Sequence, residues 1–244
     1  MTTIAGTVTV LQECGSTNTE AADRGRYRHG DAVVAVRQTD GRGQRGHRWE
    51  SAAGENLTFS VVLEPRFVPV ARQFLVSEAA ALAVADTLGR YGIDAGIKWT
   101  NDIYVGDSKI CGMLIEHSVE GNVLARSIVG VGLNVNQTSF PEWLPNPCSM
   151  AAITGLRYDV MEVFRRFYDN LASRYGMLED GAAERLHAEY NRLLYRRGVP
   201  SRYLIPSHGE VVGTITGVEP DGTLLVAIDG TVSGFRFKEI EFII

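Results

Sequence analysis

The sequence has little of what marks an exported, membrane-bound or zinc-binding protein. Its three cysteines, Cys14, Cys111 and Cys148, are widely spaced and odd in number, which indicates reduced thiols and a cytoplasmic location. It contains no C-x-x-C pair and only scattered histidines, so no zinc-binding pattern is visible. Its N-terminus lacks the basic start and apolar run of a signal peptide, and no apolar stretch is long enough to cross a bilayer. These absences predict a protein without a membrane partner.

An excess of positive charge is also missing. Lysine and arginine together number 24 against 29 aspartates and glutamates, which gives a net charge of −5. This balance argues against a protein whose main partner is nucleic acid, although it leaves room for a local basic site. No internal repeat or low-complexity segment interrupts the chain. Its 244 residues therefore suit one large domain, or a larger and a smaller one.

Hydrophobic periodicity predicts a mixture of strands and helices. Strands are expected over residues 7–12, 31–36, 56–63, 95–105, 109–117 and 123–132. Helices are expected just after an N-cap at Ser16 and over residues 70–90, 160–178 and 182–196, with a loop over 137–155. In the second helix, one face carries Leu75, Ala79, Leu82 and Ala83.

The composition changes near Gly198–Pro200. From there to Ile244 only short alternating strands follow, separated by turns such as EPDGT and DGT. Such a segment predicts a small β-barrel appended to a core of helices and sheet. We therefore expect two domains, residues 1–197 and 198–244.

The segment GRGQRGHRWES, residues 41–51, concentrates glycine and arginine in an acidic chain. It matches the dinucleotide fingerprint G-x-G-x-x-G and follows a predicted strand. It does not open a helix, however, and only about ten residues precede the next strand, too few for a crossover helix. A solvated surface loop is the ordinary alternative. Trp49 favours burial, glycines let a ligand approach the backbone, and arginines bind phosphates or carboxylates. These residue types predict a loop, mobile while empty, that closes over an anionic ligand.

Other segments place polar residues and glycines at strand ends. They are KWTND (98–102), SKICGMLIE (108–116) and GVGLNVN (130–136). Each has an ordinary explanation when taken alone: Lys109 as an exposed lysine, Asn134 as a turn residue and Asp102 as a cap. Together with GSTN (15–18) and QTDGRGQRGHRW (38–49), their order and spacing resemble the biotin protein ligases. The C-terminal strands, ending FRFKEIEFI, are similar to the small SH3-like domain of that family.

The resemblance implies an α+β fold: a mixed β-sheet flanked by helices, the class II synthetase-like core of biotin and lipoate ligases, followed by a small SH3-like β-barrel. It implies an ATP-dependent ligase that activates biotin to biotinyl-5′-AMP and transfers it to a lysine of a biotin carboxyl carrier protein, as in acetyl-CoA carboxylase. ATP and biotin are then substrates, and Mg²⁺ accompanies the nucleotide without assigned ligands. Members of the family are monomers or homodimers. Some carry an N-terminal helix-turn-helix, but GSTN begins at residue 15, so no DNA binding is expected.

The same resemblance implies three sets of site residues. The catalytic set is Lys109, Arg42 and Asp102, in which the cations offset the repulsion between a carboxylate and a triphosphate, while Asp102 helps to deprotonate the incoming lysine. The biotin-binding set is Ser16, Thr17, Asn18, Gln38, Gly41, Arg42, Lys109 and Gly112. The nucleotide-binding set is Gln44, Arg45, Arg48, Trp49, Asn101, Asp102 and Asn134.

Two positions depart from the family pattern. Gln44 stands where many members have an arginine that contacts the adenylate; Arg45 or Arg48 then supplies the charge, or the intermediate is held less tightly. Thr100 replaces a proline, which alters turn rigidity. Two other functions stay open. A lipoate ligase would lack the GRGxxGxxW element, and a non-catalytic biotin-binding protein would not need both Lys109 and Arg42.

Overall fold

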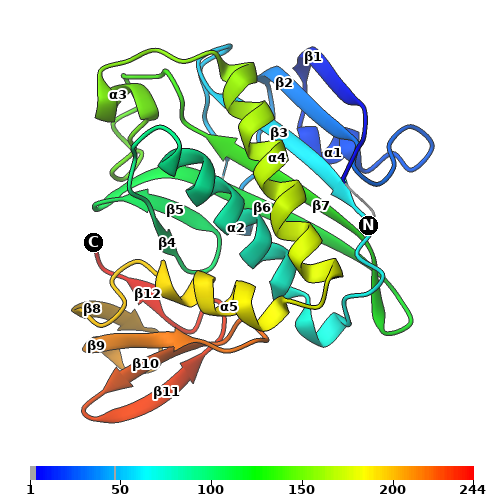
Figure 1. Ribbon diagram of the computed structural model, residues 1–244. Helices are drawn as coiled ribbons and strands as arrows, with labels where there is room; N and C mark the ends of the chain where they lie inside the picture. Colours follow the sequence, from blue (N-terminus) through cyan, green and yellow to red (C-terminus); the bar gives the residue numbers. More distant parts are fainter. Residues whose placement is uncertain (1–3, 47) are drawn as a thin grey trace.

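Two β-sheets organise the chain (Figure 1). The computed structural model describes residues 4–46 and 48–244, with the side chain of Arg45 left out. The first sheet has seven strands in the order β1-β2-β3-β7-β6-β5-β4, and its only parallel pair among the described residues is β1 with β2. Its strands are β1 Val8–Cys14, β2 Ala32–Gln38, β3 Leu57–Leu63, β4 Gly96–Lys98, β5 Asp102–Val105, β6 Ser108–Glu120 and β7 Val123–Leu133.

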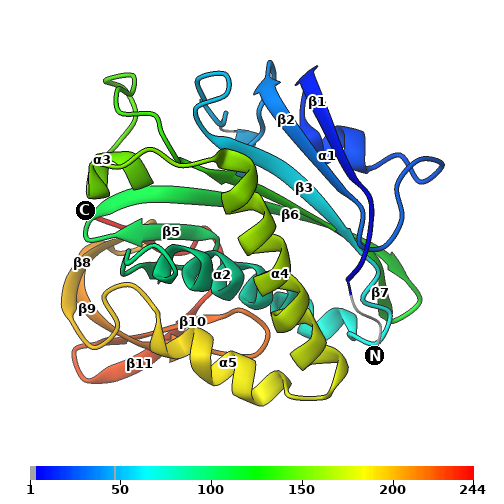
Figure 2. The ribbon, with the colours of Figure 1, turned by 45° about the horizontal axis from the view of Figure 1, so that its top comes forward.

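Helices cover both faces of this mixed sheet (Figure 2). The long helices α2, Phe74–Gly89, and α4, Val160–Glu179, pack on one face, and α5, Ala183–Arg192, packs against α2. The short helix α1, Thr17–Ala21, lies against β2, β3 and β7. Alternating strand residues divide between the two faces: Val61 belongs to the large core under α2 and α4, whereas Val62 belongs to a small cluster beneath α1.

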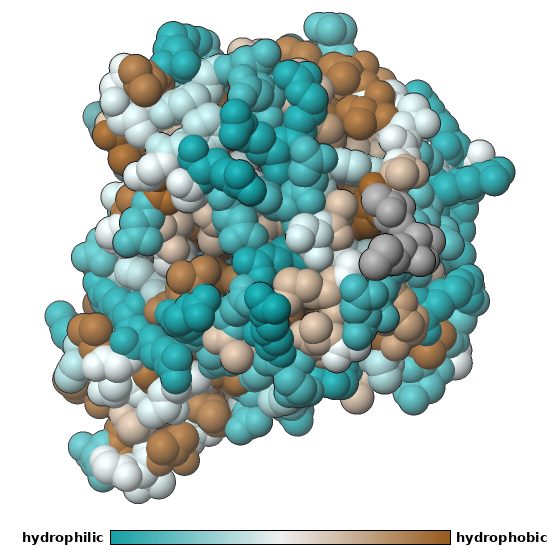
Figure 3. All heavy atoms as spheres, in the orientation of Figure 1, coloured by the Kyte–Doolittle hydropathy of each residue, from teal (hydrophilic) through white to brown (hydrophobic). Residues whose placement is uncertain are grey.

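The degree of burial differs between the two long helices. Twelve of the 16 residues of α2 are buried, because α2 lies between the sheet, α4 and α5. The sequence predicts one apolar face for this helix, but more of the helix surface is buried than that face alone. Helix α4 is amphipathic and buries Phe164, Phe167 and Leu171 as expected. Its outer side contributes to a largely hydrophilic surface with scattered hydrophobic residues (Figure 3).

The second sheet is antiparallel and has the order β11-β10-β9-β8-β12. Its strands are β8 Pro200–Ile205, β9 Gly209–Val218, β10 Leu224–Ile228, β11 Thr231–Phe235 and β12 Glu241–Phe242. The predicted strand-rich C-terminal segment is thus confirmed. In the part of the chain that is described, β11 and β12 form the two edges and do not pair with each other, so the sheet is not closed into a barrel.

Three sequence-based element boundaries are wrong. The strand expected over 95–105 is two strands, β4 and β5, because Asn101 turns the chain: its side chain donates to the carbonyl of Met113 and its carbonyl accepts from Met113 N at 2.9 Å. The loop expected over 137–155 contains helix α3, Met150–Thr154. Helix α5 ends at Arg192, before the expected residue 196.

A single hydrophobic core connects both sheets. It contains residues of the first sheet, helices α2, α4 and α5, and residues of the second sheet such as Tyr203, Ile215 and Leu224. Trp99, after β4, donates its indole N–H to the carbonyl of Gly222 at 2.9 Å. Among the described residues, no helix has the length and apolar character needed to span a membrane.

Candidate active site

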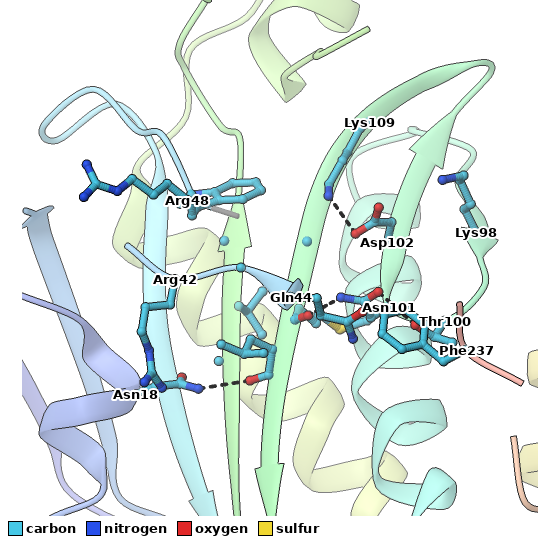
Figure 4. A pocket seen from close by; sticks show the side chains of 18 of the residues that line it. Asn18, Arg42, Gln44, Arg48, Lys98, Thr100, Asn101, Asp102, Lys109 and Phe237 are labelled. Carbon is cyan, nitrogen blue, oxygen red and sulfur yellow. Dashed lines mark hydrogen bonds and ion pairs between the residues drawn. The ribbon is translucent and has the colours of Figure 1, made fainter. Parts of the chain in front are cut away.

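A cavity of about 560 Å³ lies on the face of the seven-stranded sheet that carries α1 (Figure 4). Its walls come from α1, the loop after β2, the β4–β5 turn, the centres of β6 and β7, and the C-terminal segment around β12. Twelve of the residues expected from the sequence line it: Ser16, Thr17, Asn18, Gln38, Arg42, Gln44, Arg48, Trp49, Asn101, Asp102, Lys109 and Gly112. The fold therefore brings together segments that are about 100 residues apart in the chain.

The other expected residues do not line the cavity or cannot be placed. Gly41 lies beside it: a Cβ atom added there would come within 2.6 Å of the carbonyl oxygen of Trp49. Asn134 is buried and does not line the cavity; its side chain donates to the carbonyl of Cys148 at 2.9 Å. The side chain of Arg45 lies outside the described part of the structure.

A hydrogen-bonded cluster forms the α1 end of the cavity. The Gln38 side chain accepts hydrogen bonds from Thr17 N at 2.8 Å and Thr17 Oγ1 at 3.1 Å. Ser16 is the N-cap residue of α1 as predicted, but it makes no side-chain cap hydrogen bond, so Gln38 satisfies the first turn instead. Ser60 Oγ on β3 lies 2.6 Å from Asn18 Oδ1, a contact that no local pattern in the sequence indicates.

Two paired glycines form the floor of the cavity. Gly112 on β6 is directly opposite Gly132 on β7. The Trp49 indole lies on this bare backbone, since a Cβ atom at Gly132 would overlap the indole and one at Gly112 would lie 3.1 Å from it. The buried Trp49 Nε1 has no hydrogen-bond partner in the described residues. The loop thus places a large aromatic side chain on the floor of the cavity.

Two residues on opposite sides of the cavity, Arg42 and Lys109, form ion pairs, and Figure 4 shows Arg42 on one side and the Lys109–Asp102 pair on the other. Arg42 donates to both carboxylate oxygens of Glu116, at 2.7 and 2.6 Å, and Asn18 Nδ2 donates to Glu116 at 2.7 Å. Lys109 Nζ lies 2.7 Å from Asp102 Oδ1. Both expected cations are therefore paired with carboxylates of the protein. Glu116 belongs to the segment SKICGMLIE, but sequence analysis assigned it no role.

The C-terminal segment supplies a wall that sequence analysis missed. Phe237, Ile240, Glu241 and Phe242 line the cavity, together with Lys98 on β4. The four C-terminal residues carry no motif that connects them to a site some 130 residues earlier. Three other lining residues lie within motifs noted in the sequence. Lys98 is part of KWTND, and Gly130 and Gly132 are two residues apart within GVGLNVN, so both face the cavity.

The polar side chains that line the cavity are mainly cations, amides and hydroxyls. Burial raises the pKa of the Cys111 thiol and raises that of Cys148 to about 11, so neither supplies a thiolate nucleophile near neutral pH. The described residues contain no cluster of three or more metal-ligating side chains. A flat floor, a polar end and two cations suit a small carboxylic acid that lies beside a second anionic ligand.

The fold and the cavity are those expected of a domain that binds a small acid beside a second anion. The chain belongs to the Biotin/lipoate A/B protein ligase family, whose model matches residues 11–134. All residues that the sequence assigned to the site fall within that range. The predicted family is therefore confirmed.

Relatives and solved structures agree with this assignment. The Bifunctional ligase/repressor BirA of Salmonella typhimurium is 29% identical over 97% of this chain and 74% of its own length. A Biotin–(acetyl-CoA-carboxylase) ligase of Mycobacterium tuberculosis is 28% identical over 91% of this chain and 83% of its own. The structure of a biotin protein ligase from Aquifex aeolicus in complex with biotin and ATP has a TM-score of 0.82 and 25% identity, covering 96% and 97% of the two chains. The predicted fold class is confirmed by this likeness.

Proposed function

We propose that this protein is an ATP-dependent biotin protein ligase. It forms biotinyl-5′-AMP from biotin and ATP, and it transfers the biotinyl group to a specific lysine of a biotin carboxyl carrier protein. The observation that carries the proposal is the cavity in which Arg42 and Lys109 flank a glycine floor, in a chain similar to a ligase bound to biotin and ATP. The cytoplasmic location, the monomeric or homodimeric state, the absence of DNA binding and the boundary at residue 197 stay predictions.

The polar end and the cations of the cavity favour one orientation of biotin. Its neutral ureido ring is placed at the α1 end, where Ser16, Thr17 and Gln38 offer hydroxyl and amide groups. Its tail runs over Gly112 and Gly132 toward Lys109, which requires the Trp49 indole to move off the floor or to rise over the tail. The carboxylate then competes with Asp102 and Glu116 for the cations Lys109 and Arg42.

The chemistry follows from that placement. One oxygen of the biotin carboxylate attacks the α-phosphorus of ATP, the bond to the bridging oxygen breaks, and pyrophosphate leaves with the electron pair. Lys109 and Arg42 offset the repulsion between the two anions. The amine of the acceptor lysine then attacks the biotinyl carbonyl and displaces AMP. Asp102, once released from Lys109, can accept the proton of that amine.

Mg²⁺ is proposed to enter with the nucleotide. Protein sites for this ion commonly contribute one or two carboxylates and leave the remaining positions to phosphates and water. Asp102 and Glu241 line the cavity and fit that modest requirement. When bound, the ion would offset charge on the phosphates.

Replacement of Lys109 tests the proposal directly. We expect Lys109→Ala to lower biotin-dependent pyrophosphate release by about 10²-fold or more, the scale for losing one charge-stabilising group. The fold should persist, because the Lys109–Asp102 pair is partly exposed to solvent. The measurement is pyrophosphate release with ATP and biotin, with thermal unfolding as the check on folding.

Lys238→Gln is the matched control, since this exposed lysine does not line the cavity. Near-normal activity of Lys109→Ala would remove Lys109 from the catalytic set. A wild-type protein that binds biotin without releasing pyrophosphate would be a non-catalytic binding protein. Pyrophosphate release with lipoate in place of biotin would identify a lipoate ligase.

A further inference from the structure

Lys98 stands on the cavity wall on the far side of the Lys109–Asp102 pair from Arg42. It is the last residue of β4, and the strand register places it directly opposite Asp102 on β5. Its side chain is half-buried and lines the cavity. Figure 4 shows its ammonium end turned toward Asp102. Residues directly opposite on antiparallel strands have neighbouring side chains, so Lys98 and Lys109 flank the same carboxylate.

Two aromatic rings hold Lys98 in place. Its Nζ lies 5.1 Å from the centre of the Tyr104 ring and 5.0 Å from that of Phe242. Phe242 belongs to β12 of the second sheet and packs against Tyr203, with the ring centres 5.3 Å apart. Cation–π contacts of this kind restrict an otherwise flexible side chain before any ligand binds. The second sheet thus fixes a positive charge at a defined point of the cavity.

The proposed reaction indicates which phosphates of ATP lie next to Lys98. In phosphoryl and nucleotidyl transfer the attacking and leaving oxygens are roughly in line with the phosphorus. The biotin carboxylate approaches from the α1 side, past the glycine floor, and reaches Lys109. The leaving pyrophosphate therefore lies beyond Lys109, on the side of the cavity where Lys98 stands.

We propose that Lys98 binds the β- and γ-phosphates of ATP and stabilises the leaving pyrophosphate, and that Phe242 of the second sheet positions it. This inference rests on the proposed ligase function. Lys98 transfers no proton in this step; the bond between the α-phosphorus and the bridging oxygen breaks, and the electron pair leaves with pyrophosphate next to the Lys98 side chain. The role belongs only to the first half-reaction, because pyrophosphate is absent from the transfer to the carrier protein.

The experiment separates the two half-reactions in Lys98→Gln, Lys98→Arg and Phe242→Leu. Adenylate formation is followed with varied ATP at saturating biotin, with and without added pyrophosphate. Transfer is followed in a single turnover from purified biotinyl-AMP to a biotin carboxyl carrier domain. We expect Lys98→Gln to lower kcat/KM for ATP by about 10²-fold, to weaken inhibition by pyrophosphate, and to leave the transfer rate within about twofold of wild type.

Two companion variants separate the effect of the Lys98 charge from the effect of the aromatic ring that positions it. Lys98→Arg keeps the charge and should restore most of the ATP dependence. Phe242→Leu keeps an apolar side chain but removes the ring, and should lower kcat/KM for ATP by about 2- to 30-fold, the range of one cation–π contact. Lys238→Gln should match wild type in both assays.

Two outcomes would overturn the inference. If Lys98→Gln forms adenylate normally but transfers slowly, Lys98 docks the carrier protein. If both half-reactions are unchanged while thermal stability falls, its role is structural. Failure of the proposed function is distinguishable, because the wild-type protein itself would then form no biotinyl-AMP from ATP and biotin.

Discussion

At the scale of single residues, two cations of the cavity, Arg42 and Lys109, are already paired with carboxylates. Arg42 and Glu116 have side-chain exposures of 41% and 43%, and pairs this exposed contribute little to stability. A ligand anion can therefore take Arg42 from Glu116 at small cost. The pairing also explains how several positive charges fit one cavity before a substrate brings its own negative charge.

Gln44 is the residue where the chain departs most clearly from the family pattern. It lies in a short 3₁₀ segment, Gln44–Gly46, and lines the cavity. We expect Gln44→Arg to slow the escape of biotinyl-AMP by about tenfold or more, because it adds a charge-assisted hydrogen bond to the intermediate. The measurement is free adenylate released without carrier protein. Gln44→Met, which adds no charge, is the control, and an equal or greater leak from Gln44→Arg would contradict the expectation.

Some residues of the site can be predicted from the sequence, and others cannot. Lys109, Asp102 and Arg42 follow from short motifs, because the chemistry needs those side chains at fixed positions along a segment. The partner of Arg42 cannot be predicted in this way. Glu116 is 74 residues from Arg42 in the chain, and only the sheet brings the two together. Phe242 is further still from the motifs, so its place on the cavity wall can be found only from tertiary packing.

At the scale of elements, the loop after β2 is a small folded unit in the structure. Arg42 and Arg48 form an antiparallel bridge, and Trp49 N donates to the carbonyl of Gly41 at 2.9 Å. His47 lies outside the described residues. Two side chains hold the loop to the sheet: the Trp49 indole lies on Gly112 and Gly132, and Arg42 pairs with Glu116 on β6. The sequence predicts that ligand orders the loop, and the strength of these two contacts decides how mobile the empty loop is.

Limited proteolysis tests the mobility of the loop. Trypsin can cut after Arg42, Arg45 and Arg48. We expect saturating biotin and ATP to slow these cuts, because the bound anions supply counter-charge for the arginines and a surface for Trp49. Cleavage sites are identified by mass spectrometry at matched times. Equal rates with and without the two substrates would show that the loop is not a lid ordered by ligand.

The glycine floor makes a related prediction. In Gly132→Ala the new methyl group would overlap the Trp49 indole, so the loop should lose its anchor and be cut faster by trypsin without substrates. Tryptophan fluorescence should shift to longer wavelength as the indole becomes exposed. Gly176→Ala, in helix α4 with open space around the added Cβ atom, is the control. An unchanged cleavage rate in Gly132→Ala would mean that Trp49 does not hold the loop.

Most elements could be predicted because their signals are local. Strand β3 is rich in apolar and β-branched residues, and helix α4 has a clear 3.6-residue period with Asp159 as its N-cap. Helix α3 was not predicted although Ser149 caps it and Gly155 ends it in the left-handed conformation, because it is short and the segment before it is rich in proline, serine and asparagine like a loop. The division of 95–105 depends on a hydrogen bond from Asn101 to β6, which no local period reveals.

At the scale of the whole molecule, a chain of hydrogen-bonded polar residues connects helices α2 and α5 to the second sheet. Glu78 on α2, which is 0% exposed, lies 2.6 Å from His187 Nδ1 on α5. Asn191 on α5 contacts His187 Nε2 at 3.1 Å and accepts from Val218 N of β9 at 2.7 Å. Together with the shared core, this chain makes the second sheet part of the same cooperative structure. The predicted boundary at residue 197 thus separates segments of different composition that are packed together.

The pair Glu78–His187 makes the stability of this structure depend on pH. The hydrogen bond to the Glu78 carboxylate raises the pKa of His187, and burial raises the pKa of Glu78. Arg72 and Glu184 are the other charged groups that act on the pair. A group whose pKa is higher in the folded protein contributes its full stability below its unfolded value, about 6.5 for histidine. That contribution is lost as the pH rises through the folded value.

We therefore expect the free energy of unfolding to fall as the pH rises above about 6.5. Glu78→Gln removes the carboxylate but can still accept a hydrogen bond from His187, so its stability should change less over the same range. Urea unfolding at pH 6, 7, 8 and 9 measures both profiles. Glu162→Gln removes a carboxylate from an exposed i,i+4 pair with Arg166 and serves as the control. If wild type and Glu78→Gln lose the same free energy over this range, the Glu78–His187 pair is not the source of the dependence.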